Sequence, residues 1–380
     1  MNFDSSEEQR LLAASIERFL TRDYSFEARR RIVASPDGYS RDAWKTLANL
    51  GLPALAVAAD FGGLGGSARD LAGVMEAMGH ALIVEPFLAT VVAARIIATA
   101  ASADQRQALL PPIAAGELIA AFAHTEEGAR YHIAHVATRA RRTSDGFVID
   151  GDKRVVLHAP CSHWLVVSAR LEGAAADIDG IALFVVKADT PGISLAAYRT
   201  LDELPAADIA LADVRVPADA KLGEASSALG AIEDAADYAT ALVCAEAVGA
   251  IQYANEATLE YLKNRRQFGV PIGSFQALQH RMVDMAIEYE QAKSMANLAC
   301  AAVDREGDPV GRKRIVSAAK VRIADACRRV SQESIQLHGG MGMSDELKIS
   351  HTFRRLTMIA QQFGDADHHL ERFAHLSAHP

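Results

Sequence analysis

The stretch NRRQFGVPIGSFQ, which runs from Asn264 to Gln276, closes a long helical pattern with paired arginines. Arginine at the end of a helix complements the helix dipole, and Gly with Pro beyond it is the expected stop signal. One interpretation is therefore a helix end followed by a turn and a new helix. The other is a phosphate site, in which Arg265 binds phosphate oxygens and Phe268 covers an adenine-type ring.

Helical patterns surround this stretch on both sides. They are predicted over Leu229–Arg265, Gln276–Val303 and Gly311–Leu337, and residues 1–118 also follow helical spacing. Ser5 and Ser6 are predicted to cap the first helix, and Ser40 a later one. The glycine-rich residues 58–68 could form a phosphate cradle, but no strand clearly precedes them and no GK[ST] follows, which favours a tight loop between helices.

Residues 119–223 have a different pattern, with short β-rich segments separated by Gly, Asp and Ser. This predicts an antiparallel sheet with hairpin turns at Ser144–Gly146 and Asp150–Gly151. The order of helices, strands and helices predicts an α+β fold. Its expected parts are an N-terminal helical domain (1–118), a middle β domain (119–223) and a C-terminal helical domain (224–380). No Rossmann fingerprint follows any strand.

Composition excludes several classes of function. The 380 residues carry a formal net charge of −9, which argues against nucleic-acid binding. No apolar run approaches the roughly 18 residues of a membrane span, and the acidic N-terminus is not a signal peptide, so we expect a cytoplasmic protein. The four cysteines are scattered without metal-ligand spacing. They are expected to be reduced, mostly buried thiols, with no metal site.

A second motif, QLHGGMGM at Gln336–Met343, follows Gln276 after about 60 residues of helical pattern. The pair of motifs resembles the C-terminal half of the acyl-CoA dehydrogenases, flavoproteins that take hydrogen from the α and β carbons of acyl-CoA thioesters. The resemblance extends along essentially the whole chain, through FDSSEEQRLL, WKTLANLGL, DFGGLGG and HTEEG. It implies an N-terminal helical domain, a middle β domain and a C-terminal four-helix bundle that forms tetramers.

The resemblance also implies FAD, with its isoalloxazine ring between the β domain and the bundle and its dinucleotide end reaching a neighbouring subunit. Arg265 matches the arginine at the pyrophosphate, where a guanidinium offers a bidentate fork and glycines allow close backbone approach. The other matching positions at that end are Phe268, Gln276, Gln336, Gly339 and Gly340. Without the resemblance, the two glycines would indicate only a helix stop and a turn.

The β domain matches the family less well. Thr125 and Glu126 match the threonine and glutamate of the flavin loop VTEPGAGSD, but the sequence here continues as EGARYH. Lys153 is kept from the motif KxWITNG, whereas Val155 and Leu157 stand in the Trp and Thr positions. The flavin face is therefore atypical, and its pocket is either reshaped or not fully competent.

The catalytic base is the largest departure. Removing an α-proton requires a carboxylate near that carbon. The usual glutamate position, 27 residues after Gln336, is Phe363, and the alternative position on the long helix is Ala239. Both are vacant, so Asp365, two residues beyond the first, is the candidate base. Glu246, on the long helix, is either paired within the bundle or near the flavin, and pairing is favoured.

The pair His368-His369, followed by Glu371 two residues later, could suggest metal ligands. Adjacent residues on a helix point about 100° apart, however, which favours a solvated helix face.

The departures from the family motifs together resemble the small subunit of pimeloyl-CoA dehydrogenase and its relatives, which work with a larger subunit on dicarboxylic or bulky acyl chains.

The first hypothesis is an FAD-dependent acyl-CoA dehydrogenase subunit. An acidic side chain would remove the α-proton, the flavin would take the β-hydride, and electrons would leave to an electron-transfer flavoprotein. The assembly would be a homotetramer or an α2β2 heterotetramer. The second hypothesis is a non-catalytic subunit that completes the FAD site of a larger partner. A third is a flavoprotein of this fold that oxidises a substrate other than an acyl-CoA.

Overall fold

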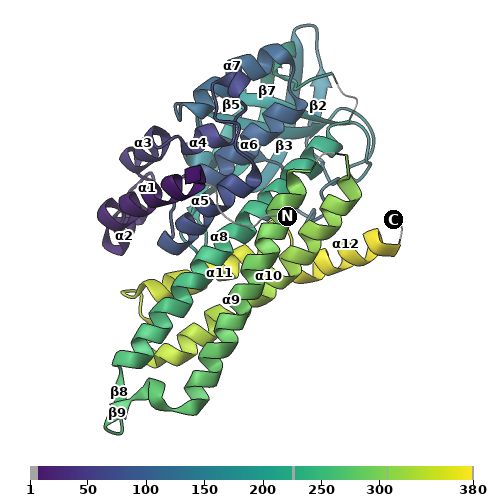
Figure 1. The fold of residues 1–380 in the computed structure, drawn as a ribbon. Helices are drawn as coiled ribbons and strands as arrows, with labels where there is room; N and C mark the ends of the chain where they lie inside the picture. The colour runs from purple at the N-terminus through teal and green to yellow at the C-terminus, as the bar shows by residue number, and fades with distance from the viewer. Residues whose placement is uncertain (1–6, 225–226, 306, 379–380) are drawn as a thin grey trace. The chain divides into compact units, whose positions relative to one another are not determined.

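The computed structural model describes residues 7–224, 227–305 and 307–378, and Figure 1 labels most of their helices and strands. By its internal contacts the chain divides into two compact units. One comprises Met1–Arg29, Ala68–Ile83 and Asp237–Pro380, and the other comprises Arg30–Ser67 and Val84–Ala236. The N-terminal helices are thus shared between both units rather than forming a compact unit of their own.

The first unit is helical. Its helical elements are α1 (Glu7–Asp23), α5 (Ala68–Ala81), most of α8 (Leu229–Asn264), the 3-10 turn η4 (Ile272–Ser274), α9 (Gln276–Val303), α10 (Pro309–His338), the 3-10 turn η5 (Gly339–Met343), α11 (Lys348–Gln361) and α12 (Ala366–Ala378). A short hairpin, β8 (Arg266–Gln267) and β9 (Val270–Pro271), follows α8. The three long helices predicted from the sequence are confirmed. The third begins earlier than predicted because Asp308 caps it, accepting a hydrogen bond from the Gly311 N–H at 2.7 Å. The predicted cap at Ser5 and Ser6 lies outside the described residues.

Helices α5 and α8 approach each other closely through two glycines. A Cβ on Gly249 of α8 would collide with the backbone oxygen of Glu76, and one on Gly79 of α5 would collide with that of Glu246. Only glycine lets the two backbones come so near. This packing explains why α5 belongs to the helical unit although it lies in the N-terminal third of the sequence.

The second unit combines helices with a sheet. Its helices are α3 (Arg41–Asn49), α4 (Leu52–Leu55), η1 (Ala59–Phe61), α6 (Phe87–Ala100) and α7 (Ala103–Ala114), with η2 (Ala159–Cys161) and η3 (Ala218–Ala220) beside the strands, while α2 (Phe26–Ala34) crosses the boundary between units. The predicted cap at Ser40 is confirmed, because its Oγ accepts from the Ala43 N–H at 3.1 Å. Residues 58–68 lie between α4 and α5, as the loop interpretation predicted.

The sheet has seven strands: β1 (Ala120–Ala123), β2 (Arg139–Arg142), β3 (Gly146–Leu157), β4 (Trp164–Arg170), β5 (Ile181–Lys187), β6 (Ile193–Arg199) and β7 (Pro205–Pro217). Their order is β1-β4-β2-β3-β7-β6, with β5 paired to β4. Most of the pairings are antiparallel, as predicted, but β1 and β2 both run parallel to β4. Strand β4 separates them, so a long loop rather than a hairpin joins β1 to β2.

One of the two predicted hairpin turns is confirmed. Thr143 N–H donates to the Gly146 carbonyl at 2.9 Å where β2 turns into β3. The other prediction was wrong: Gly151 lies inside β3, at an irregularity in its pairing with β7. Gly151 has φ +149° and its Cβ position lies 2.6 Å from Thr138 Oγ1, so glycine is needed there for close packing.

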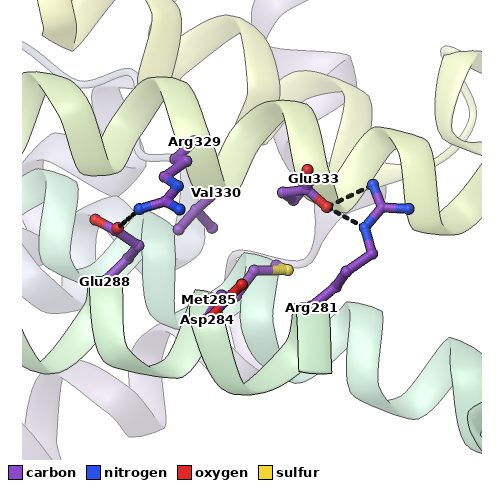
Figure 2. Close-up of a pocket in the computed structure, with 7 residues that line it drawn as sticks. All are labelled: Arg281, Asp284, Met285, Glu288, Arg329, Val330 and Glu333. Carbon is purple, nitrogen blue, oxygen red and sulfur yellow. Dashed lines mark hydrogen bonds and ion pairs between the residues drawn. The ribbon is translucent and has the colours of Figure 1, made fainter. Parts of the chain in front are cut away.

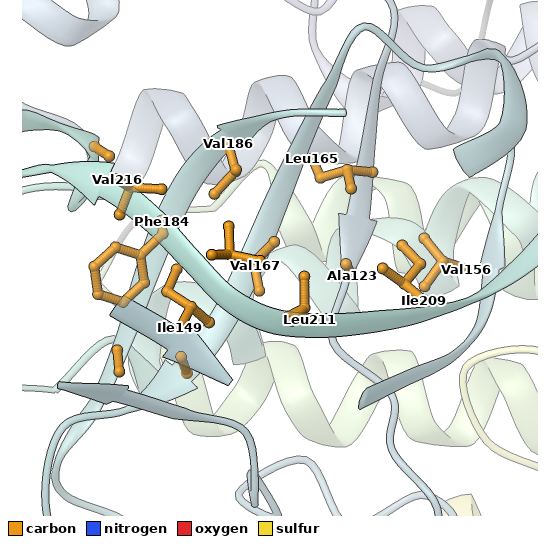
Figure 3. Close-up of a cluster of buried hydrophobic side chains, with 14 of the residues drawn as sticks. Ala123, Ile149, Val156, Leu165, Val167, Phe184, Val186, Ile209, Leu211 and Val216 are labelled. Carbon is orange, nitrogen blue, oxygen red and sulfur yellow. The ribbon is translucent and has the colours of Figure 1, made fainter. Parts of the chain in front are cut away.

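The sheet encloses a core of apolar side chains, shown in Figure 3. Ile149, Val167 and Phe184, from three different strands, are fully buried. Phe147 contacts Phe184 edge-on at a centroid distance of 5.1 Å. This rigid core supports the loops at the strand ends, where the candidate site residues of this unit lie.

The cysteines are free thiols, as expected. Cys244, Cys300 and Cys327 are buried, whereas Cys161 is only partly so. Burial raises the pKa of Cys244 and Cys327 to about 12, so these thiols are unreactive.

Among the helices of the described residues, none combines the length and apolarity needed to cross a membrane.

Candidate functional site

The first candidate motif forms a hairpin at the end of α8. Strands β8 (Arg266–Gln267) and β9 (Val270–Pro271) pair antiparallel, and Phe268 and Gly269 between them both have positive φ. Phe268 is 92% exposed. Arg265 precedes the hairpin, and its side chain is exposed while its backbone is held at both ends, N–H to Tyr261 O and carbonyl to Ile272 N–H, each 2.8 Å. An anchored backbone with a free cationic side chain suits the binding of an external phosphate.

The second motif ends α10. Gly339 has φ +59° and ψ −143°, a conformation that favours glycine. A Cβ at Gly339 or Gly340 would meet no atom within 4 Å, so the backbone there faces open space. Gln276, at the start of α9, and Gln336 are also exposed. The two glycines therefore leave room for a ligand to approach the main chain.

A ring pair that the sequence reasoning missed joins the two motifs. Tyr261 stacks on His338 with centroids 4.5 Å apart and ring planes 27° apart. Tyr261 precedes Arg265 by one helical turn, and His338 immediately precedes Gly339. His338 lies within the quoted motif, but no local signal pairs it with Tyr261, because the two are distant in sequence. The arginine and the glycines are thus brought to the same end of the helical unit, which fits a dinucleotide.

In the β unit, the segment after β1 carries Thr125 and Glu126. Thr125 is exposed, whereas Glu126 is only 5% exposed. The Glu126 carboxylate accepts from Lys153 Nζ at 2.6 Å, from Thr138 Oγ1 at 2.7 Å and from the N–H groups of Ala137 and Thr138. Burial by itself would raise the pKa of Glu126, but the charge of Lys153 and these hydrogen bonds outweigh burial and lower it.

The strand position expected to hold the family tryptophan has an unusual backbone. Val155 has φ +52° and is 50% exposed. Its N–H donates to Asp208 Oδ1 at 3.0 Å, and the preceding Arg154 N–H donates to the Thr125 carbonyl at 2.7 Å. A β-branched residue with positive φ is strained. These hydrogen bonds fix the bulge beside Thr125.

Phe363, at the expected base position, lies in the turn after α11. It has φ +60° and is 37% exposed. Its carbonyl oxygen lies 3.0 Å from His369 Nε2. Buried Lys320 donates to the carbonyls of Ile359 and Gln362, at 2.6 and 2.8 Å. Side chains from α10 and α12 therefore fix the backbone of this turn.

The candidate base Asp365 is the N-cap of α12. Its Oδ1 accepts from the His368 N–H at 2.9 Å. At the alternative base position, Ala239 is completely buried. The nearby carboxylate of Asp237 is paired with Arg312 at 3.0 Å and Arg372 at 2.8 Å.

Glu246 is paired within the helical unit, as favoured from the sequence. Arg355 binds both of its oxygens, Nε to Oε1 and Nη2 to Oε2, each at 2.6 Å.

The expectation of a solvated face at His368 and His369 was wrong for His369, which is 2% exposed. Its ring packs under Gly364, whose Cβ position lies 2.5 Å from its Nε2. Among the described residues, no group of His, Cys, Asp or Glu is arranged to hold a metal ion.

A small pocket lies between α9 and α10 (Figure 2), and none of the predicted site residues lines it. Two ion pairs line it: Arg281 with Glu333 at 2.5 Å and Arg329 with Glu288 at 2.6 Å. Figure 2 shows these pairs bridging the two helices. They hold α9 against α10.

The comparisons with known proteins agree with this fold. Residues 6–117, 121–214 and 229–375 match the N-terminal, middle and C-terminal domains of acyl-CoA dehydrogenase. The chain belongs to the acyl-CoA dehydrogenase family. The family resemblance and the α+β architecture expected from the sequence are thereby confirmed.

Similar proteins align with most or all of this chain. Acyl-CoA dehydrogenase FadE12 of Mycobacterium tuberculosis is 31% identical over 85% of this chain and 84% of its own. The solved Tcur3481-Tcur3483 steroid ACAD is 29% identical, covers 98% of both chains and has a TM-score of 0.87. PigA, solved with FAD and proline, is 26% identical, covers 100% of this chain and 99% of its own and has a TM-score of 0.90.

Proposed function

We propose that this acyl-CoA dehydrogenase family member is an FAD-binding subunit that dehydrogenates an acyl-CoA thioester between its α and β carbons. The observation that carries the proposal is the Tyr261–His338 stack, which joins the helix end before Arg265 to the helix end before Gly339 and Gly340. An exposed guanidinium and an open glycine backbone suit a pyrophosphate. PigA, a neighbour of the same fold, is solved with FAD.

Each proposed site residue has a physical role. Arg265 would hold the pyrophosphate, and the exposed ring of Phe268 would cover the adenine. The remaining contacts at that end would come from Gln276, Gln336, Gly339 and Gly340, and Thr125 and Glu126 would serve the flavin end. Bound FAD supplies the two-electron chemistry that no amino-acid side chain provides.

The acyl group is proposed to be bulky or dicarboxylic. The Tcur3481-Tcur3483 protein is a steroid ACAD, and at 29% identity over 98% of the chain it supports a large substrate. For the complete system we propose a homotetramer or an α2β2 assembly with a larger paralogous subunit, and an electron-transfer flavoprotein as electron acceptor.

The test is made on the protein purified alone. Its visible spectrum is recorded, and saturated acyl-CoAs, including dicarboxylic and steroid-derived ones, are then added without oxygen. Oxidised flavin itself absorbs at about 450 nm. Bleaching of this band would establish a dehydrogenase that needs no partner. Free proline belongs in the panel, because PigA was solved with that amino acid. Bleaching by proline alone would contradict the acyl-CoA assignment.

A second candidate is a non-catalytic subunit that completes the FAD site of a larger partner. The positions of the carboxylates favour it: Asp365 caps a helix, Glu246 is held by Arg355, and Asp237 is paired with two arginines. Yellow protein that never bleaches alone but does so with a larger paralogue would support this role. Colourless protein that cannot take up FAD would contradict the first proposal and leave the second.

A further inference from the structure

The segment that carries Thr125 is anchored by a buried network of charged and polar side chains. The ammonium of Lys153, completely buried, donates to Glu126 Oε1 at 2.6 Å, to Ser168 Oγ at 2.9 Å and to the His124 carbonyl at 3.4 Å. His124 Nδ1 lies 2.9 Å from the same Ser168 Oγ. Residues on both sides of Thr125 are therefore fixed from inside the β unit.

A second buried cation holds the segment before β2, which Glu126 also contacts. Arg170 is completely buried, and its guanidinium donates to the carbonyls of Ala134 and Val136, each at 3.0 Å. Its remaining bonds reach the carbonyls of Glu172, Ala175, Asp177 and Asp179. The Glu126 carboxylate takes the N–H groups of the next two residues, Ala137 and Thr138. The Arg170 guanidinium thus binds carbonyls in residues 134–136, and the Glu126 carboxylate binds the N–H groups of the two residues that follow.

The opposite side of Thr125 is held by the bulge in β3. Arg154 N–H donates to the Thr125 carbonyl, and the Arg154 side chain and the Val155 N–H both bind Asp208. Lys153, which binds Glu126, immediately precedes this bulge. The Glu126–Lys153 pair therefore ties together the two segments that the family uses at the flavin, although most of their motif residues are replaced here.

A buried ion pair of this kind fixes the arrangement of its neighbours but adds little to the free energy of unfolding. Removing two charges from water costs several kcal/mol per ion, roughly the amount that their attraction returns. A fully hydrogen-bonded buried pair does, however, restrict its surroundings to one arrangement. What this arrangement leaves exposed is Thr125, between the half-buried His124 and the buried Glu126.

We propose that Glu126 and Lys153 are a positioning pair, which acts on FAD through Thr125 and not by direct contact. This inference rests on the proposed binding of FAD and refines the role expected for Glu126. It implies that the β unit keeps an ordered flavin-facing segment despite the loss of the family's GSD, Trp and Thr residues.

The test measures FAD affinity and folding separately on the full-length apoprotein. Glu126→Gln keeps the shape of the side chain and removes its charge. We expect at least about tenfold weaker FAD binding, measured by flavin fluorescence, which corresponds to about 1.4 kcal/mol. Glu127→Gln is the matched control, because Glu127 is adjacent but its side chain is 84% exposed; its affinity should stay within about twofold, well under that 1.4 kcal/mol.

A double-mutant cycle distinguishes positioning from general destabilisation. Thr125→Val should weaken FAD binding in the wild-type background and add little to Glu126→Gln, because both changes remove the same contact. If Glu126→Gln does not fold, Thr138→Val removes one hydrogen bond to the same carboxylate and should weaken binding in the same direction, by less.

Two further outcomes separate the inference from the function on which it rests. Wild-type protein that takes up no FAD would overturn the proposed function, and the positioning role with it. Wild-type protein that binds FAD, with Glu126→Gln melting lower but binding FAD equally well, would overturn the positioning role alone. Full additivity of Thr125→Val and Glu126→Gln would also contradict it.

Discussion

Arg355 binds both carboxylate oxygens of Glu246 in the interior of the helical unit, with each N–O distance at 2.6 Å and each side chain only 7% exposed. The pair joins α11 to α8. Because Glu246 is held in this bidentate contact, it is not positioned to take a proton from a substrate.

The first prediction concerns this ion pair. Arg355→Met leaves the Glu246 charge buried without its guanidinium and should lower the free energy of unfolding by about 3–5 kcal/mol. Adding Glu246→Leu should recover much of the loss, since the apolar pair carries no unpaired charge. Denaturant titration measures both effects. Arg22→Met, which removes an exposed pair with Asp23, is the control and should change nothing measurable.

The second prediction separates the two possible roles of Asp365. As an N-cap of α12, it can be replaced by Asn without loss, whereas Asp365→Ala should cost about 1 kcal/mol of stability. If Asp365 is also the base, Asp365→Asn will fold normally but abolish bleaching by acyl-CoA. Normal bleaching in Asp365→Asn would remove this residue as the base.

The third prediction follows from buried His369. Burial, with a further contribution from the charge of Lys320, lowers its pKa to about 3. The unfolded chain therefore binds a proton below pH of about 6.5 that the folded chain does not, and stability falls as pH falls from there toward 3. The slope is at most about 1.4 kcal/mol per pH unit for one group.

His369→Gln should therefore make the unfolding free energy less dependent on pH between 6.5 and 4. Urea titrations at several pH values measure this slope. His280→Gln changes an exposed histidine on α9 and should leave the slope as it is in the wild type. An unchanged slope in His369→Gln would show that other groups dominate the acid response. Half-buried His124, whose pKa is also lowered to about 3, would be the next to replace.

The fourth prediction uses the turn at Phe363. Lys320 and His369, from the neighbouring helices α10 and α12, bind backbone carbonyls in and before the turn. The turn should therefore keep its backbone shape when the Phe363 side chain changes. If the flavin site is otherwise competent, Phe363→Glu should confer or increase bleaching by acyl-CoA, and Phe363→Gln should not. Equal spectra for the two variants would mean that a carboxylate at this position cannot reach the substrate.

The fifth prediction compares two adjacent glycines. Gly339→Ala forces a side chain into φ +59° and ψ −143° and should cost about 1–3 kcal/mol of stability. Gly340→Ala meets open space and should fold normally. If FAD passes close to this backbone, Gly340→Ala should nevertheless weaken FAD binding. Unchanged affinity would place the cofactor farther from Gly340.

The sequence by itself determined the helices, because helical periodicity and stop signals are local. The bounds of Gln276–Val303 were predicted to the residue, and those of the other two long helices to within two residues. The paired motifs around Arg265 and Gly339 were likewise sufficient for the family. Local patterns failed for the sheet, where the parallel placement of β1 and β2 beside β4 depends on strands far apart in the chain.

Only the tertiary structure decided what the individual charges do. Glu126 is internal because Lys153, Thr138 and Ala137 come to it from other segments, and Glu246 is paired because α11 brings Arg355 across from another part of the chain. His369 is buried because α12 folds back on the turn at Gly364. Whether a charged side chain faces water or a partner is a long-range property, since its solvation depends on which distant segments cover it.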